Sequence, residues 1–209
     1  MRVDIWSDIV CPWCYIGERR FSRGLADFEH RDEVEVVNRS FELDPSIPKG
    51  VATPILDVLA VKYGLSQAQA QEAEARVAAL AAADDLDFTI DRVMGNTFDA
   101  HRLVHLGREQ GLQERLLQRL FHAYFGEGRP VSDADVLVSL AADAGLDPAS
   151  ARQALADGSY GDAVRADEYQ ARTLGITGVP FCVVDMKYAV SGARPAETYT
   201  AALQRAWDS

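Results

Sequence analysis

Apolar and polar residues alternate at the start of the chain. Residues 2–7 place Val3 and Ile5 on the same face, which is typical of a short strand. Apolar side chains then recur every three or four positions over residues 14–28 and predict a helix with an apolar stripe. A second strand is predicted at residues 33–41. The crossover of such a β-α-β unit is right-handed, and its two strands are expected to be parallel.

A long helical, alanine-rich block follows the second strand. The loop at residues 43–50 contains two prolines and a glycine and indicates a boundary. Beyond the loop, helical spacing recurs in segments separated by glycines, at residues 54–63, 66–83, 97–110, 112–125, 132–144 and 148–156.

Strand signals return near the end of the chain, after a helix predicted at residues 161–174. Residues 181–185 and 188–191 are joined by two residues, which predicts an antiparallel hairpin. A last helix is expected at residues 195–207, where apolar side chains again share one face.

Together these elements predict an α/β fold, with one mixed sheet flanked by helices on both faces. The strands come from the two ends of the chain, so the helical block between them is predicted to be an inserted all-helical domain. The expected boundaries are residues 1–50 and 160–209 for the sheet domain and 51–159 for the insertion.

Composition narrows the functional classes. The chain has 209 residues, 48% of them hydrophobic, and can bury a core without disulfides or metal. Its net charge of −11 disfavours binding to nucleic acid or to an anionic membrane surface, because phosphates would be repelled. The first residues lack the apolar core of a signal peptide, and no apolar run approaches the ~18 residues of a membrane span. Three cysteines are also too few, and odd in number, for a secreted disulfide framework, so the expected compartment is the cytoplasm.

The candidate chemistry lies in the sequence Cys11-Pro12-Trp13-Cys14, directly after the first strand and at the start of the first helix. Pro12 suits the first helical position, which makes Cys11 the N-cap. Free backbone N–H groups and the positive helix end then favour thiolate over thiol at Cys11. Cys14 follows one turn later on the same face, within reach of a disulfide. We therefore expect Cys11 to attack and Cys14 to resolve the mixed disulfide, with Trp13 exposed to substrate.

Zinc binding and inert burial are the alternatives to redox chemistry for these cysteines. A zinc site needs four ligands, and no second CxxC motif is present, so no metal is expected. Inert, buried cysteines are a second alternative. Cys182 lies in an apolar strand, where a free cysteine behaves as a small hydrophobic residue, although its position two residues after Pro180 also allows a third thiol near the pair.

Pro180 directly precedes the strand at residues 181–185, a place where proline is tolerated. A trans bond is the usual state before proline. If the Val179–Pro180 bond is cis, the backbone of Val179 turns outward and can pair with an extended partner chain.

Five segments resemble the DsbA-like proteins of the thioredoxin superfamily, specifically their FrnE branch. They run in order along almost the whole chain and are DIVCPWCYIG at 8–17, FELDP at 41–45, NTFDAHR at 96–102, YFGEG at 124–128 and GVPF at 178–181. The resemblance implies a thioredoxin-like fold interrupted by a helical domain, with a cis-proline at Pro180 beside the CxxC motif. It also implies that the segment bearing Asn96 and His101 faces the active site.

His101 has its own alternatives. A protonated His101 that lines the site would stabilise the Cys11 thiolate or contact substrate. Equally, it is a packed or solvated histidine without a role in chemistry. A metal shared with His105, one turn later, lacks a third ligand nearby. Asn96, with an acidic residue three positions on, is predicted to be the N-cap of the helix that carries His101.

The sequence thus predicts a thiol–disulfide oxidoreductase that acts on disulfide-containing proteins or small-molecule thiols. No cofactor is required for the exchange, and glutathione is a candidate redox partner. The first rival is a glutathione-dependent isomerase or transferase, of the 2-hydroxychromene-2-carboxylate isomerase or kappa type. Those relatives carry serine where Cys11 stands. The second rival is a non-catalytic binding or chaperone-like module that uses an apolar groove beside Pro180. The sequence leaves open whether the protein forms a homodimer, as members of the resembled family often do.

Overall fold

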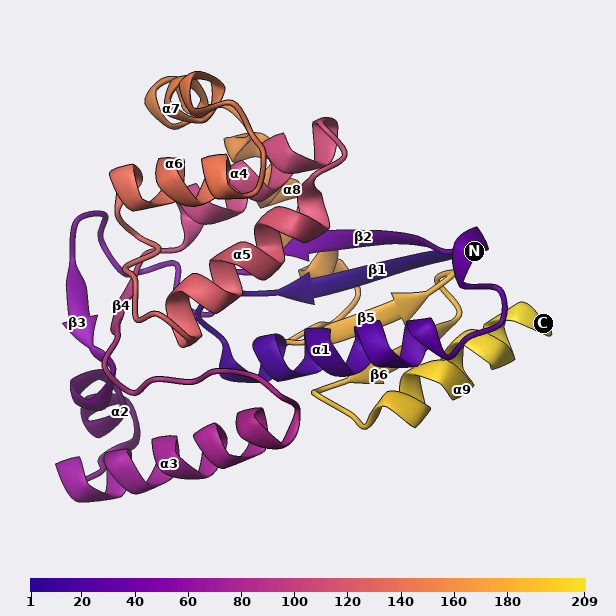
Figure 1. The fold of residues 1–209 in the computed structure, drawn as a ribbon, viewed down its shortest axis with the longest axis horizontal. Helices are drawn as coiled ribbons and strands as arrows, with labels where there is room; N and C mark the ends of the chain where they lie inside the picture. Colours follow the sequence, from indigo (N-terminus) through magenta and orange to yellow (C-terminus); the bar gives the residue numbers. More distant parts are fainter. The chain divides into compact units, whose positions relative to one another are not determined.

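The computed structural model describes residues 1–209 and divides into two compact units (Figure 1). Unit 1 comprises Met1–Leu43 and Arg165–Ser209, and unit 2 comprises Asp44–Val164. The boundaries fall several residues from those expected from sequence. The backbone N–H groups of Phe41 and Leu43 bond to Ser7 and Asp8, which keeps this stretch with the sheet.

Unit 1 is built on a four-stranded mixed sheet in the order β2-β1-β5-β6. The central strand β1 (Arg2–Ser7) runs parallel to β2 (Glu35–Ser40) and antiparallel to β5 (Phe181–Val184). Strand β6 (Tyr188–Ser191) pairs antiparallel with β5. The predicted mixed sheet, its parallel first pair and its hairpin are therefore confirmed.

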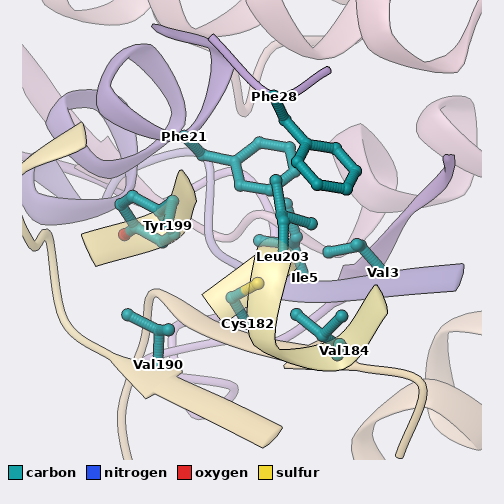
Figure 2. Packing of buried hydrophobic residues seen from close by; sticks show 10 residues of the cluster. Val3, Ile5, Phe21, Phe28, Cys182, Val184, Val190, Tyr199 and Leu203 are labelled. Atoms are coloured by element: carbon teal, nitrogen blue, oxygen red, sulfur yellow. The ribbon is translucent and has the colours of Figure 1, made fainter. Parts of the chain in front are cut away.

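Helices α1 (Pro12–Ala26) and α9 (Ala196–Trp207) supply side chains to a core cluster that includes residues of β1, β5 and β6. Figure 2 shows this cluster, in which Phe21, Tyr199 and Leu203 meet inward-facing strand residues. A second cluster contains Trp6, Ala171, Ile176 and Val183, with Ala171 from α8 (Gly161–Thr173). Because side chains alternate along a strand, Ile5 and Trp6 enter different clusters. A short 3₁₀ turn (Arg31–Glu33) precedes β2.

Close backbone approach joins α1 to α9. The hydroxyl of Thr200 donates to the carbonyl of Gly24 at 2.9 Å. A Cβ atom at Gly24 would lie 2.5 Å from the carbonyl oxygen of Ala196, so the position accepts only glycine at this helix separation. The ring of Phe21, one turn before Gly24, packs edge-on against Tyr199 with centroids 5.6 Å apart.

Unit 2 is mainly helical, and its helices begin where the sequence offers capping residues. Ser66 forms a capping box with Gln69, while Asp133 and Asp147 accept the N–H groups of Val136 and Ser150. The helices are α2 (Ile55–Tyr63), α3 (Gln67–Ala83), α4 (Phe98–Glu109), α5 (Gln113–Phe125), α6 (Ala134–Asp143) and α7 (Pro148–Asp157).

Unit 2 also contains an antiparallel ribbon, so the prediction of an all-helical insertion is wrong in this detail. Strand β3 (Ala52–Pro54) pairs with β4 (Val93–Gly95). Each strand has three residues, which is too short for a period-two pattern to be detected in the sequence. None of the helices of the protein combines the length and apolar character needed to cross a bilayer.

We predict that Gly24→Ala lowers the free energy of unfolding. The added methyl group would overlap the Ala196 carbonyl, and relieving the overlap requires α1 and α9 to separate. We expect a net loss of about 1–2 kcal/mol, even though alanine favours helix by ~1 kcal/mol. Urea denaturation measures the loss. Gly178→Ala is the matched control, because its Cβ meets nothing within 4 Å, and equal stability of the two variants would contradict the packing.

Candidate active site

The first cysteine lies at the junction between β1 and α1. Cys11 is the N-cap residue with extended φ and ψ of −87° and 113°, and Pro12 is the first helical residue, as predicted. The carbonyl of Cys11 accepts the N–H groups of Cys14 at 3.0 Å and Tyr15 at 3.2 Å. No side chain forms a cap hydrogen bond at this helix start, and the side chain at the N-cap position is the thiol of Cys11.

The two thiols differ in their surroundings. Both are free and buried, with 3% of Cys11 and 1% of Cys14 exposed. Burial raises the pKa of the Cys14 thiol well above its ordinary value, and the hydrogen bond to Cys11 and the charge of Cys11 raise it further. Cys14 therefore holds its proton at neutral pH, and its S–H group is directed to the sulfur of Cys11.

The predicted proline loop lies against Cys11. The Val179–Pro180 peptide bond is cis, the isomer that the family resemblance implies. The Sγ of Cys11 donates to the carbonyl oxygen of Val179 at 3.7 Å. Pro180 is buried, and its Cγ lies 2.8 Å from the position that a Cβ on Gly17 would occupy. The structure thus brings Val179 and Pro180 to the cysteine pair from 168 residues away.

Trp13, between the cysteines, is 44% exposed, as the sequence predicted. It lies four residues before Gly17, on the side of α1 that meets Pro180. An apolar ring is therefore available to a substrate at the helix start.

Asp8 is a neighbour of the pair that sequence reasoning missed. Its side chain accepts the backbone N–H of Leu43 at 2.7 Å, and the residue is 1% exposed. Burial is the largest cause of the raised pKa of Cys14; a hydrogen bond with the Asp8 backbone lowers that pKa, and the charge of the Asp8 carboxylate has a smaller, raising effect. The available signal was an acidic residue in the otherwise apolar stretch between β1 and the cysteine pair.

The FELDP segment has a structural explanation in Glu42. Its carboxylate accepts from Arg165 at 2.6 Å, and the same guanidinium nitrogen bonds to Glu168 at 2.7 Å. Burial, aided by the nearby Glu168 carboxyl, raises the pKa of Glu42, while Arg165 acts in the opposite direction. These contacts hold the segment after β2 onto α8.

Asn96 and His101 belong to unit 2. The N-cap of α4 is Thr97, so the prediction that Asn96 is the N-cap is wrong by one residue. Both ends of the Asn96 amide bind backbone, since Nδ2 donates to Ile47 at 2.9 Å and Oδ1 accepts from Phe98 at 3.0 Å. His101 is 2% exposed on α4. That these two residues face the cysteine pair stays a prediction.

Arg102 explains much of the NTFDAHR segment. Its buried guanidinium donates to the carbonyl oxygens of Ala154 and Leu155 near the end of α7, and to Ser159 at 2.7 Å. It also forms an ion pair with Asp99 at 2.7 Å. Helix ends carry unsatisfied carbonyls, and a cation there is favourable. This part of the segment therefore stabilises unit 2.

Cys182 lies in the core of unit 1 rather than on a surface. It pairs with Ile5 of β1 and Val190 of β6, and Figure 2 shows its sulfur within the cluster that contains Phe21 and Leu203. Burial, with the nearby charge of Asp4, raises the pKa of Cys182 to about 12. Its thiol is therefore protonated and shielded at neutral pH. No three His, Cys, Asp or Glu side chains converge as metal ligands.

The fold and the site together define a class: a thioredoxin-like protein with two cysteines at a helix start. The sequence profile of the DSBA-like thioredoxin domain matches residues 2–204, and the chain belongs to this family. The resemblance to DsbA-like proteins that was inferred from sequence is thereby confirmed.

Three solved structures illustrate the relationship. The chain is 54% identical to a probable DsbA oxidoreductase, SCO1869, from Streptomyces coelicolor, with a TM-score of 0.95 over 100% of this chain and 90% of that chain. A 2-hydroxychromene-2-carboxylate isomerase is 13% identical, with a TM-score of 0.72 over 98% and 95%. The cytosolic disulfide reductase DsbM from Pseudomonas aeruginosa, solved with GSH, is 17% identical, with a TM-score of 0.69 over 100% of both chains. The last two likenesses show the fold alone.

We predict that Cys182 makes the free energy of unfolding depend on pH in the alkaline range. The thiol keeps its proton in the folded protein up to about pH 12, whereas its ordinary value is 9.0. Its contribution is fully present below pH 9 and is lost as the pH rises toward 12. Over this range the free energy of unfolding of Cys182→Ala should fall less steeply than that of the wild type, by up to about 1.4 kcal/mol per pH unit.

Urea denaturation at a series of pH values measures both slopes. The difference between the two proteins at pH 7 gives the packing cost of the substitution separately. Parallel slopes for the two proteins would contradict the raised pKa of Cys182.

Proposed function

We propose that the protein is a thiol–disulfide oxidoreductase in which Cys11 attacks and Cys14 resolves. One observation carries the proposal: Cys11 is the N-cap of α1 with Cys14 one turn later, and the sulfur of Cys11 lies beside the Val179 carbonyl. The start of a helix carries a partial positive charge, which favours a reactive thiolate at such a position in disulfide-exchange proteins. Membership of the DSBA-like thioredoxin domain family supports the same reaction type.

The first step joins Cys11 to the substrate. The Cys11 thiolate attacks one sulfur of the substrate disulfide, a new S–S bond forms, and the substrate bond breaks. The departing sulfur leaves as a thiolate and takes a proton from solvent. The mixed disulfide carries no charge on Cys11.

The second step depends on this loss of charge. Burial is the largest cause of the raised pKa of Cys14, and the next two causes are its hydrogen bond with Cys11 and the charge of Cys11. Both disappear when Cys11 enters the mixed disulfide, so Cys14 releases its proton more readily at the moment it is needed. The Cys14 thiolate then attacks the Cys11 sulfur, and the second substrate thiol departs. The substrate has gained two electrons and two protons, and the protein holds a Cys11–Cys14 disulfide.

An external thiol closes the cycle. Two thiol molecules reduce the Cys11–Cys14 disulfide and become one disulfide, and the reverse sequence oxidises a substrate. No cofactor is needed for this exchange. We propose glutathione as the redox partner and the cytoplasm as the compartment, an assignment supported by the fold shared with DsbM, a cytosolic disulfide reductase solved with GSH. The substrates are disulfide-containing proteins or small-molecule disulfides.

Substrate contacts in this proposal come from Trp13 and Val179. The exposed ring of Trp13 offers apolar contact, and the backbone of Val179 offers main-chain pairing to an extended peptide. A homodimer is the proposed assembly.

The isomerase alternative shares the fold but lacks support at the reactive position. In this chain Cys11 and Cys14 stand together, and a pair of thiols suits disulfide exchange better than the binding of a glutathione thiolate by one hydroxyl. Retention of isomerase or transferase turnover by Cys11→Ser would favour the alternative. A chaperone-like role would survive Cys11→Ala/Cys14→Ala, which removes both sulfurs.

We predict that Cys11→Ser lowers the rate of peptide disulfide reduction by about a thousandfold or more, because the attacking sulfur is lost. Cys14→Ala should instead accumulate a covalent adduct with the peptide, since the mixed disulfide cannot be resolved. Intact-protein mass spectrometry detects that adduct, and a glutathione-coupled assay follows the rate.

Cys182→Ala is the matched control, because it removes a thiol that lies in the core. It should retain the wild-type rate within about twofold. Activity that survives in Cys11→Ser, or disappears in Cys182→Ala, would exclude the proposed roles.

A further inference from the structure

The loop that joins β6 to α9 is bound to the proline loop of the site. The N–H of Gly192 donates to the carbonyl oxygen of Pro180 at 2.9 Å. Gly192 has a φ of +82°, a conformation that other residues rarely adopt, so its backbone is shaped for this contact. The next residue, Ala193, lies 3.5 Å from the position that a Cβ on Gly17 would occupy. The loop therefore lies against both Pro180 and α1.

Tyr199 holds this loop from α9. Its hydroxyl donates to the carbonyl oxygen of Gly192 at 3.0 Å, and the residue is 3% exposed. Burial, with the neighbouring Cys182 and Cys14, raises the pKa of Tyr199 to about 12, so the hydroxyl is a donor throughout the neutral range. Figure 2 shows the ring on the same side of the sheet as Phe21 and Cys182. A buried hydroxyl needs a partner, and here the partner is the loop.

Arg20 holds the same loop from α1. Its Nη1 donates to the carbonyl oxygen of Ala193 at 2.8 Å. Arg20 lies on the helix whose first turn carries the two cysteines. The loop is thus tied to the cysteine helix by Arg20, to α9 by Tyr199 and to the proline loop by Pro180.

We propose that Tyr199 and Arg20 are positioning residues that hold the Val179 carbonyl against the sulfur of Cys11 through this loop. The inference deepens the proposed function and rests on it for its effect on substrate. The contacts form one series: Tyr199 to Gly192, Gly192 to Pro180, and Val179, the neighbour of Pro180, to Cys11 at 3.7 Å.

Loosening the loop has two opposite consequences. The Val179 carbonyl accepts the S–H of Cys11 and presents the negative end of its dipole, which favours thiol over thiolate. If the Val179 carbonyl is held less firmly against the sulfur of Cys11, the thiolate therefore forms at lower pH. The same looseness weakens main-chain pairing between Val179 and a peptide substrate, so exchange with a peptide disulfide slows.

The experiment compares Tyr199→Phe and Arg20→Met with Tyr188→Phe. Each of the first two substitutions removes a donor to the loop and keeps most of the apolar side chain. Tyr188→Phe removes a hydroxyl from the far end of β6, where the ring lies against Arg205, and is the matched control. Two quantities are measured: the rate with a disulfide-bonded peptide, and the pH at which alkylation of Cys11 by iodoacetamide is half-maximal.

In Tyr199→Phe and Arg20→Met, the peptide rate is expected to fall about fivefold, the effect of one lost hydrogen bond. In Tyr199→Phe, which changes no charge, the half-maximal pH of alkylation is expected to fall by about half a unit, while Tyr188→Phe matches the wild type in both measurements. Arg20→Met is judged by the peptide rate alone, because it also removes a positive charge and thereby disfavours a thiolate. General destabilisation would not make Cys11 alkylate at lower pH while it slows the peptide. The positioning role is overturned if Tyr199→Phe behaves as Tyr188→Phe, or if its half-maximal pH stays or rises.

Failure of the proposed function gives a different result. If the wild type does not exchange the peptide disulfide, the oxidoreductase proposal fails. The alkylation profiles of the variants still decide whether the loop positions Val179. If the wild type exchanges disulfides and Tyr199→Phe does so equally well, only the positioning role fails.

Discussion

The antiparallel pairing of β1 with β5 is the constraint on which the site depends. Trp6, near the end of β1, stands opposite Phe181, the first residue of β5. Because the strands run in opposite directions, the segment that leaves β1 and the segment that enters β5 meet at the same edge of the sheet. The first segment leads to Cys11 and the second contains Val179 and Pro180. A shift of one residue in this register would turn the inward side chains of β5 to the other face and move the carbonyl away from the sulfur.

Charged side chains near β1 are buried as ion pairs between acidic and basic residues, although the chain as a whole is strongly acidic. Arg39 of β2 bridges Asp4 of β1 and Asp167 of α8, with both contacts at 2.7 Å. The N–H of the Trp6 indole donates to the carbonyl of Asp167 at 3.1 Å. Such contacts fix α8 over the sheet, and removing one member would leave an uncompensated charge inside the protein. Side chains of β1 therefore make contacts on both faces of the sheet, with α8 on one face and with the cluster of α1 and α9 on the other.

The sequence predicted the parts of the structure that local rules govern. Pro12 predicted the start of the helix and made Cys11 its N-cap, and alternation predicted the strands. The partners of Asp8, Arg20 and Tyr199 could not be predicted, because each binds a backbone group that only the tertiary fold brings near. The β3–β4 ribbon was missed for a similar reason, since its short strands are recognisable only by their pairing. Asn96 was misplaced by one residue because its side chain acts just before the cap, on the N–H of Phe98.

The core position of Cys182 restricts which covalent states the protein can reach. Three thiols allow three intramolecular bridges, and two of these would require a sulfur from the interior of the sheet layer to emerge. Cys182 is packed with Ile5, Phe21 and Leu203 in the core of unit 1, whereas Cys14 is hydrogen-bonded to Cys11 at the start of α1. In the proposed reaction, Cys14 is therefore the thiol placed to form a bridge with Cys11. The place of Cys182 in the core thus favours one intramolecular bridge over a mixture of bridges.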